Sequence, residues 1–296
     1  MSFTLPPEFA SRVRIAEPMA RHTSWHVGGP ADIFFMPRDR ADLIAFLKIL
    51  PPEVPLLWLG LGSNLLVRDG GLRGVVIATR DALLALERRS ERGVYAEAGV
   101  PCAKLARQCA RWDLGPAEFF TGIPGTVGGA LAMNAGAFGG ETWRQVVSVE
   151  TIDRHGVVRE RHRDEFQIGY RHVDAPANDE WFLAANFHFE AGSSEADTRA
   201  LLERRKQTQP IGEWSCGSVF TNPSGDHAAR LIEAAGLKGL RIGGAVVSTK
   251  HANFILNEGA ATARDIETLI RQVQQEVARQ HGRQLTPECR IVGEAA

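Results

Sequence analysis

The sequence predicts an α+β protein that consists of more than one module. Strand and helix patterns alternate over the first third of the chain, and a glycine-rich segment and a hairpin pattern follow. The pattern changes again near residue 192, after which the chain carries its own helices and short strands. With 296 residues, the chain can form two to three modules whose cores need neither disulfides nor a structural metal.

The first third is expected to contain short strands around one helix. A helical pattern over 43–50 is stopped by Pro51. A second helix should run over 100–112, with Cys102 and Cys109 on its buried face. Apolar runs bounded by glycine and aspartate predict strands at 31–36, 54–59, 65–67 and 75–77.

A hairpin is expected in the middle of the chain. The strand patterns 146–152 and 157–161 are separated by the turn sequence of residues 153–156. Beyond the boundary, a polar helix capped at Ser194 should reach about Thr208.

Two helices are expected in the last module. The first covers about 226–235 and ends at Gly236. The second begins with the capping pattern of Thr262 and Asp265 and ends at Gly282. Its buried face repeats apolar residues at helical spacing: Ile266, Leu269, Ile270, Val273 and Val277.

Charge and composition exclude several function classes. The 34 basic and 35 acidic residues give a net charge of −1, so binding to nucleic acid through bulk charge is not expected. Four cysteines without CxxC spacing and nine histidines without HExxH predict no metal and reduced thiols in the cytoplasm. No signal peptide is predicted. The uncharged stretch 119–140 holds seven glycines, which suits a ligand-facing loop better than a membrane helix.

Glycine is enriched and clustered. The chain has 30 glycines, about 10% against an average of about 7%, and eight lie between Gly115 and Gly140. Three segments, 26–30, 59–64 and 121–130, hold glycines whose backbone N–H groups could surround a phosphate, and Ser63, Thr121 and Thr126 could add hydroxyl donors. A Rossmann fingerprint fails because position 65 is Leu. Ordinary tight turns and a non-Rossmann dinucleotide site both fit the pattern, and we favour the second.

Several polar residues could perform chemistry. Arg171 follows Tyr170, Ser218 follows a glycine, and Glu288 precedes the last strand pattern. A further stretch, 250–254, combines Lys, His and Asn ahead of a predicted strand. Each residue also has an ordinary interpretation, as a surface ion pair, a turn residue or a solvated charge. Ser218 does not lie in a GxSxG motif, so an α/β-hydrolase is not indicated.

Seven segments in one order resemble the UDP-N-acetylenolpyruvoylglucosamine reductase family of bacterial flavoenzymes. The resemblance covers about residues 21 to 293 and rests on RHTSWHVGGPAD, LGLGSNLLVRDGGLRGVVI, FFTGIPGTVGGALAMNAGAFG, GYR, GSVFTNP, GGAVVSTKHANFILN and PECRIVG. It implies an FAD-binding module of the vanillyl-alcohol-oxidase type in two lobes, 1–80 and 81–205. A C-terminal substrate-binding domain, 206–296, would follow.

The resemblance also implies the cofactor and the reaction. Hydride would pass from NADPH through FAD to the enolpyruvyl ether of UDP-N-acetylglucosamine, giving UDP-N-acetylmuramate for peptidoglycan precursors. The residues that match the family's cofactor loops are Gly60, Gly62, Ser63, Asn64, Leu65, Gly122, Ile123, Gly125, Thr126, Gly128, Gly129, Asn134 and Gly136.

By the same resemblance, three residues would carry the chemistry. Arg171 and Glu288 would stabilise the charge that develops at the substrate carboxylate, and Ser218 would supply the proton to carbon. The residues that match the family's substrate contacts are Tyr170, Asn222 and Lys206.

One departure concerns the substrate diphosphate. Some family members close a tyrosine-bearing loop over it, but this chain has only Tyr95 and Tyr170, which indicates the subclass without that loop. A monomer acting on a small molecule, away from membranes and nucleic acids, is expected. An FAD oxidase acting on a small alcohol and a non-catalytic nucleotide-binding module remain the alternatives.

Overall fold

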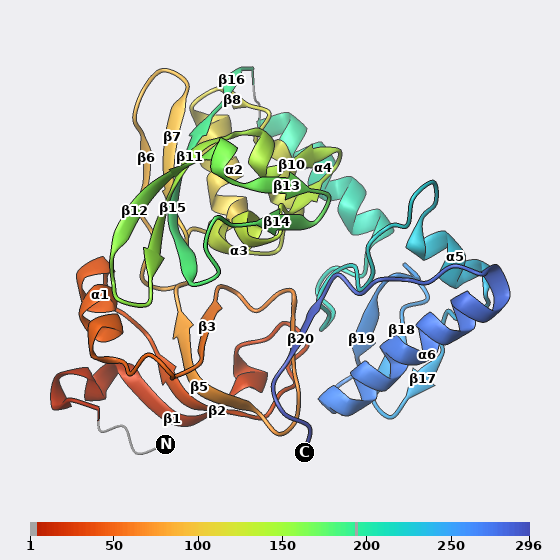
Figure 1. Ribbon diagram of the computed structural model, residues 1–296. Coiled ribbons are helices and arrows are strands. Elements are labelled where there is room, and N and C mark those ends of the chain that lie inside the picture. Colours follow the sequence, from red (N-terminus) through yellow and green to blue (C-terminus); the bar gives the residue numbers. More distant parts are fainter. Residues whose placement is uncertain (1–4, 193–194) are drawn as a thin grey trace. The chain divides into compact units, whose positions relative to one another are not determined.

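The computed structural model describes residues 5–192 and 195–296 (Figure 1). The chain forms two compact units. The first comprises the chain up to Ile15 together with Ile33–Leu61 and Gly74–Arg204, and the second comprises Ala16–Asp32, Gly62–Arg73 and Arg205–Ala296. The following elements run from one unit into the other: β1 (Val13–Pro18), β2 (Pro30–Phe35), β5 (Leu72–Ala78) and α4 (Glu195–Thr208).

A five-stranded antiparallel sheet organises the first unit. Its strand order is β12-β11-β15-β7-β6. The strands are β6 (Leu86–Arg88), β7 (Gly93–Glu97), β11 (Val146–Asp153), β12 (Val158–His162) and β15 (Glu180–His188). Helix α3 (Val127–Ala132) packs against β15 and β7, and helix α2 (Cys102–Arg111) packs against the 3₁₀ turn η3 (Glu118–Gly122).

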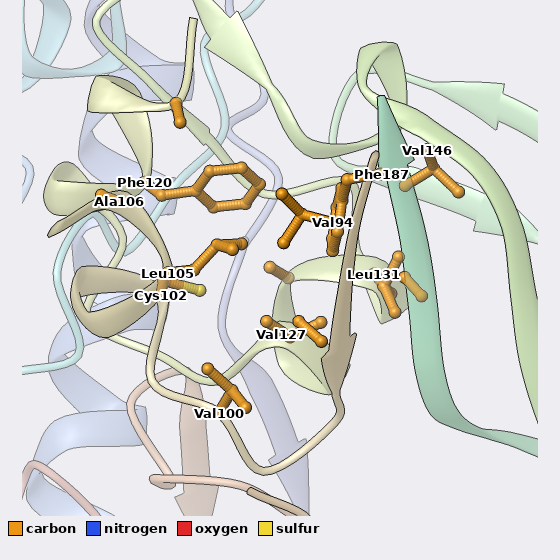
Figure 2. Close-up of a cluster of buried hydrophobic side chains, with 14 of the residues drawn as sticks. Val94, Val100, Cys102, Leu105, Ala106, Phe120, Val127, Leu131, Val146 and Phe187 are labelled. Carbon is orange, nitrogen blue, oxygen red and sulfur yellow. The ribbon is translucent and has the colours of Figure 1, made fainter. Parts of the chain in front are cut away.

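Helices α2 and α3 pack against the sheet and form a hydrophobic core with it. Figure 2 shows Val94 and Phe187 of the sheet facing Leu105 of α2 and Val127 and Leu131 of α3. All five side chains are buried, so the two helices fix the glycine-rich segment that lies between them in sequence. Burial raises the pKa of the Cys109 thiol to about 12, as expected for a structural thiol on the inner face of α2.

Smaller elements complete the first unit. Helix α1 (Arg40–Ile49) is capped by Asp39, whose side chain accepts a hydrogen bond from Asp42 N. Strand β3 (Leu56–Leu59) pairs in parallel with β5 in a sheet of order β1-β2-β5-β3. The remaining elements are η1 (Pro7–Arg12), β8 (Leu114–Gly115), β9 (Gly136–Ala137), β10 (Gly140–Glu141), η4 (Thr142–Arg144), η5 (Arg163–Glu165), β13 (Gln167–Gly169), β14 (His172–Asp174) and β16 (Glu190–Ala191).

The second unit is built around its longest helix, α6 (Ala263–His281). This helix packs on β17 (Arg241–Ile242) and β18 (Ala245–Val247), which continue into β19 (Ile255–Asn257) as one antiparallel sheet. Its apolar face, which includes Ile266 and Val273, is buried in one core. The other elements are η2 (Met19–Arg21), β4 (Leu65–Val67), α5 (Ala228–Ala234) and β20 (Arg290–Val292), of which β4 and β20 pair in parallel.

Most local predictions are confirmed. Thr262 forms the predicted capping box with Asp265, and Gly282 ends α6 with a φ of 62°. The hairpin β11–β12 turns at Gly156, where φ is 76°. The polar helix reaches Thr208 as predicted, whereas its expected cap, Ser194, lies outside the described residues.

The glycine-rich segment differs from the prediction. We expected a loop throughout, but Val127–Ala132 forms α3 in spite of the two glycines in its first turn. The burial of Val127 and Leu131 against the sheet explains this, because tertiary packing outweighs the cost of glycine in a helix.

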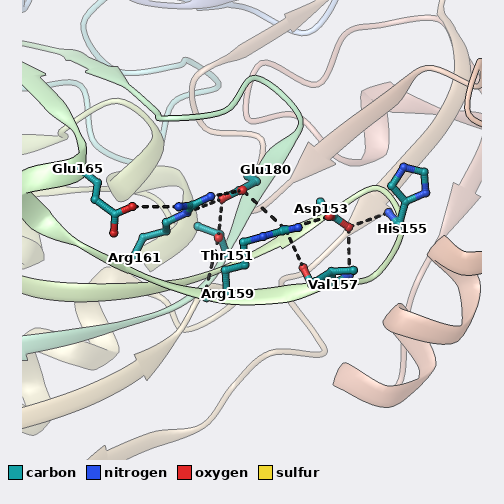
Figure 3. A network of polar contacts seen from close by, with 8 residues as sticks. All are labelled: Thr151, Asp153, His155, Val157, Arg159, Arg161, Glu165 and Glu180. Atoms are coloured by element: carbon teal, nitrogen blue, oxygen red, sulfur yellow. Dashed lines mark hydrogen bonds and ion pairs between the residues drawn. The ribbon is translucent and has the colours of Figure 1, made fainter.

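An ionic network joins β12, β11 and β15 of the sheet (Figure 3). Arg161 Nη2 donates to Glu180 Oε1 at 2.6 Å, and Thr151 Oγ1 donates to Glu180 Oε2 at 2.8 Å. Arg161 lowers the pKa of Glu180, chiefly through this hydrogen bond. Such a carboxylate stabilises the fold above the pKa it has when unfolded and loses that contribution as the pH falls toward its lowered folded value.

We expect Glu180→Gln to destabilise the protein by about 2 kcal/mol at neutral pH, because a charged hydrogen-bond acceptor is lost from a side chain that is only 5% exposed. Denaturant unfolding should show this difference, and the two proteins should converge only as the pH falls below the lowered pKa that Glu180 has in the folded protein. Glu190→Gln, in the exposed pair with Arg92, should change stability by less than about 0.5 kcal/mol. A difference for Glu180→Gln that persists at acid pH would contradict the account.

Candidate active site

Two of the predicted cofactor loops meet inside the first unit. A Cβ on Gly60 would lie 2.5 Å from Thr126 Oγ1, so Gly60 is required for the two loops to approach each other. Thr126 is buried and caps α3, with its hydroxyl accepting from Gly129 N. Gly60 and the segment 121–130, which are far apart in the sequence, are thereby brought together at one end of α3.

The loop after β3 presents backbone donors. None of the described residues accepts a hydrogen bond from the backbone N–H groups of Leu61, Gly62 and Ser63. Gly62 has a φ of 64°, and a Cβ there would meet His22 O at 2.0 Å. Asn64 and Leu65 continue into β4, where Leu65 pairs with Arg290. Consecutive free N–H groups at a glycine turn suit the oxygen atoms of a phosphate.

The glycines around α3 divide by what surrounds them. A Cβ on Gly122 would lie 2.5 Å from Ala137 Cβ, and one on Gly128 would lie 2.9 Å from Ala98 Cβ. Packing within the protein therefore explains these two glycines.

Gly129 is different because it is exposed and a Cβ there would meet nothing nearer than 3.8 Å. Glycine in a helix costs about 1 kcal/mol relative to alanine, and at Gly129 no contact within the protein requires it. Between η3 and α3, Ile123 accepts a hydrogen bond from Gly125 N, and Gly125 accepts one from Cys102 N, which fixes this part of the loop to α2.

Arg171 is fixed against the segment that contains Asn134 and Gly136. Its guanidinium donates to Gly136 O at 2.7 Å and to Asn134 O at 3.4 Å. The Asn134 amide in turn donates to Gly169 O at 2.9 Å and accepts from Trp143 N at 3.1 Å. Arg171 has a φ of 54°, in the left-handed region that costs a non-glycine residue energy. The structure holds this arginine in one orientation despite that cost.

Ser218 and Glu288 lie together in the second unit. Glu288 N donates to Val219 O at 2.7 Å, and Phe220 forms an antiparallel bridge with Pro287. The Asn64 side chain donates to Glu288 O at 3.1 Å. One predicted cofactor residue and two predicted catalytic residues therefore belong to one cluster of this unit.

Two buried cysteines flank this pair. Burial, reinforced by the neighbouring Cys289 thiol and by Glu288, raises the pKa of Cys216 well above its usual value. A thiol with so high a pKa stays protonated and is a poor nucleophile at neutral pH. Cys216 is therefore not a reactive thiolate, and both buried cysteines serve the packing of this core.

The predicted substrate residues are more exposed. Tyr170 is 51% exposed, with the Arg171 guanidinium 5.1 Å from its ring centre. Asn222 is exposed and its side-chain oxygen accepts from Ala228 N at the start of α5. Lys206 is exposed near the end of α4, and its carbonyl accepts from Lys250 Nζ at 2.6 Å.

The predicted residues thus fall into one set in each unit. Arg171, Asn134 and Gly136 are joined in the first unit, and Ser218, Glu288 and Asn64 in the second. Among the described residues, no helix is long and apolar enough to cross a membrane. Within those same ranges, no group of three or more His, Cys, Asp or Glu side chains could hold a metal ion.

Comparison with known proteins decides the family. The model of an FAD binding domain matches residues 31–161, and that of the UDP-N-acetylenolpyruvoylglucosamine reductase C-terminal domain matches residues 209–292. UDP-N-acetylenolpyruvoylglucosamine reductase from Alkalilimnicola ehrlichii is 63% identical over 282 residues, 94% of each chain. The chain belongs to the UDP-N-acetylenolpyruvoylglucosamine reductase family. The Methylococcus capsulatus reductase is 58% identical over 94% of this chain and 92% of its own.

A solved structure supports the family assignment. The crystal structure of the reductase from Thermus caldophilus superimposes with a TM-score of 0.81 at 33% identity, covering 95% of this chain and 98% of its own. The predicted fold class, an FAD-binding module followed by the C-terminal domain of this reductase family, is confirmed, as is FAD as the cofactor. The lobe and domain boundaries and the roles of individual residues stay predictions.

One group of residues escaped the sequence interpretation. The stretch 250–254 stood out for its Lys, His and Asn, but no role followed from it. In the structure, Asn253 is buried and binds the backbone of Val219 and Phe220. An asparagine inside an apolar pattern directly ahead of a strand is a signal that could have indicated a buried polar contact.

Proposed function

We propose that this protein reduces UDP-N-acetylglucosamine enolpyruvate to UDP-N-acetylmuramate in the synthesis of peptidoglycan precursors, with NADPH as reductant. The observation that carries the proposal is the 63% identity with the Alkalilimnicola ehrlichii reductase over 94% of both chains. The hydrogen bond from Glu288 N to Val219 O, next to Ser218, and the anchoring of Arg171 agree with the proposal, because these are residues that the family resemblance assigns to the reaction.

The residues present fit FAD. The free N–H groups of Leu61, Gly62 and Ser63 would bind its pyrophosphate, and the open face of Gly129 would let it approach the backbone. Bound FAD supplies the redox chemistry, which is hydride transfer between the nicotinamide and the substrate.

The chain's own residues would act on the charge and the proton. Hydride addition to the vinyl carbon remote from the carboxylate places negative charge on that carboxylate. The Arg171 guanidinium would stabilise this charge, since it is already oriented by two backbone carbonyls. The Glu288 carboxyl would also stabilise the charge that develops at the substrate carboxylate.

Ser218 would complete the reaction by donating its hydroxyl proton to the other vinyl carbon, the one that bears the carboxylate. A serine hydroxyl is a weak acid, so the basicity of the enolate and close positioning must drive the transfer. Asn222 would help to hold the uridine diphosphate part of the substrate, with Lys206 as a second candidate for that contact, and Tyr170 would also contact the substrate.

Gly129→Ala separates the ligand role of this glycine from a packing role. We expect the flavin-free variant to melt no lower than the wild type, because alanine favours the helix and fits the space. Its dissociation constant for FAD should rise at least about tenfold, because the methyl group would overpack the bound cofactor.

The control for this experiment is Gly128→Ala. It should destabilise the flavin-free protein, since its Cβ would lie 2.9 Å from Ala98 Cβ. Unchanged FAD affinity in Gly129→Ala, measured by fluorescence titration, would remove Gly129 from the proposed cofactor surface.

The function itself is tested with the purified protein. It should carry a visible flavin spectrum and oxidise NADPH only when the enolpyruvyl substrate is present. Oxygen consumption with a simple alcohol would instead indicate an FAD oxidase, and binding without turnover would indicate a nucleotide-binding module. Either result would contradict the proposal.

We also propose that the protein is a monomer and that it is located in the cytoplasm. All four cysteines are free and buried, as in proteins of reducing compartments. Light scattering of the FAD-loaded protein at working concentration should give the mass of a single chain, and a dimer mass would contradict that part of the proposal.

A further inference from the structure

The Ser218 hydroxyl has no side-chain anchor. Ser218 is half-buried, and its hydroxyl makes no hydrogen bond with any of the described residues. Gly217, which precedes it, has a φ of 82° and open space around its Cβ position. The place of Ser218 therefore depends on how the backbone that follows it, at Val219 and Phe220, is held.

That backbone is held on one side by the segment that carries Glu288. Val219 O accepts from Glu288 N at 2.7 Å, and Thr221 N donates to Thr286 O at 3.0 Å. These bonds fix the register of residues 219–221 against residues 286–288. The backbone groups on the other edge of residues 219–221 need a different partner.

Asn253 holds the other edge with three hydrogen bonds. Its side-chain oxygen accepts from Phe220 N at 3.0 Å, its side-chain nitrogen donates to Phe220 O at 2.8 Å, and its backbone oxygen accepts from Val219 N at 2.9 Å. The oxygen and the nitrogen of an amide side chain can accept and donate toward one residue in this way. Asn253 is only 4% exposed, so water does not replace these bonds easily.

Asn253 is itself fixed by the turn that precedes it. Its N–H donates to His251 Nδ1 at 3.3 Å, and Ser248 Oγ accepts from the N–H groups of Lys250 and His251. Burial lowers the pKa of His251, which favours the neutral ring that can accept this bond. The amide is therefore presented to Phe220 from a preformed turn.

From these contacts we propose that Asn253 is a positioning residue for proton donation by Ser218. It touches neither substrate nor cofactor; it fixes the backbone of Val219 and Phe220, and through that backbone the direction of the Ser218 hydroxyl. The inference rests on the role proposed above for Ser218. It gives the 250–254 stretch a function that its sequence pattern did not reveal.

The test compares the two half-reactions in FAD-loaded variants. In Asn253→Ala, reduction of the bound flavin by NADPH should be unchanged, while its reoxidation by the enolpyruvyl substrate should slow about 10- to 100-fold, the effect of displacing a reacting group by about 1 Å. Amide hydrogen exchange at Phe220 should accelerate in the same variant, measured without substrate.

A double-mutant cycle separates positioning from general damage. If Asn253 acts through Ser218, adding Asn253→Ala to Ser218→Ala should cause no further loss, because the two residues then act as one unit. Additive losses, or equal slowing of both half-reactions, would overturn the inference. Should Ser218→Ala itself retain a tenth of normal turnover or more, the proposed role of Ser218 fails instead.

Matched variants keep the test decisive. Asn257 is an equally buried asparagine of the same unit whose side chain binds Trp25 O, Gly259 N and Ala261 N. Asn257→Ala should leave the ratio of the two half-reaction rates unchanged. Asn253→Asp keeps the acceptor for Phe220 N but loses the donor, so it should fold and show a smaller selective slowing. Failure of both Asn253 variants to fold would assign the residue to the core of the unit and overturn the inference.

Discussion

Replacing Ser218 with alanine should leave flavin reduction by NADPH intact and slow product formation by about 10² to 10⁴-fold. That range is the usual contribution of a positioned general acid. The hydroxyl makes no hydrogen bond within the described residues, so its removal should not disturb the fold. The melting temperature and FAD content should match those of the wild type.

Stopped-flow measurement of each half-reaction provides the test. The first half-reaction is followed with NADPH alone under anaerobic conditions, and the second by mixing the reduced enzyme with the enolpyruvyl substrate. Turnover at a tenth of the normal rate or better would exclude Ser218 as the proton donor. Ser215→Ala provides a control, since Ser215 precedes the same glycine turn but has no proposed role.

Removing the Arg171 guanidinium should slow the second half-reaction by about 10² to 10³-fold, the usual loss when one preorganised donor to a developing negative charge is removed. Reduction by NADPH should change far less. Arg171→Lys should restore little of the rate, because an ammonium group cannot reproduce the planar fork that spans Gly136 O and Asn134 O.

A pair of variants separates the effect of losing the Arg171 charge from the effect of its left-handed backbone conformation. Arg171 has a φ of 54°, so Arg171→Gly relieves a conformational cost of about 1–2 kcal/mol that Arg171→Ala keeps. Both variants lack the guanidinium and should lose the same rate, while Arg171→Gly should be the more stable in urea. If the more stable variant, Arg171→Gly, were also clearly faster in the second half-reaction than Arg171→Ala, the effect of Arg171 on the rate would come from the stability of the fold.

Local patterns predicted the elements whose ends are encoded nearby. The limits of α6 follow from Thr262 and Gly282, which satisfy the backbone groups at its two ends. The hairpin β11–β12 follows from its turn, where Asp153 accepts hydrogen bonds from the N–H groups of His155 and Val157.

Features that depend on long-range pairing could not be predicted in this way. No local pattern shows that residues 62–73 join the second unit, because this follows from the parallel pairing of Leu65 with Arg290. The short helix α3 was missed because its glycines disfavour a helix, whereas burial of Val127 and Leu131 stabilises it.

The candidate site shows the same division. The residues with motifs, Ser218, Glu288 and Arg171, were predicted because the family resemblance aligns them. Asn253 was not, because its function depends on hydrogen bonds to residues 33 positions away. Side chains that act through the backbone of another residue leave only a weak signal in a single sequence.

One anaerobic experiment tests the central claim most directly. The purified protein is reduced with one equivalent of NADPH, and the enolpyruvyl substrate is then added without oxygen. The account predicts that the flavin spectrum bleaches and then returns in full, with one UDP-N-acetylmuramate formed per flavin. A spectrum that returns only when air is admitted would show that the enzyme does not reduce this substrate.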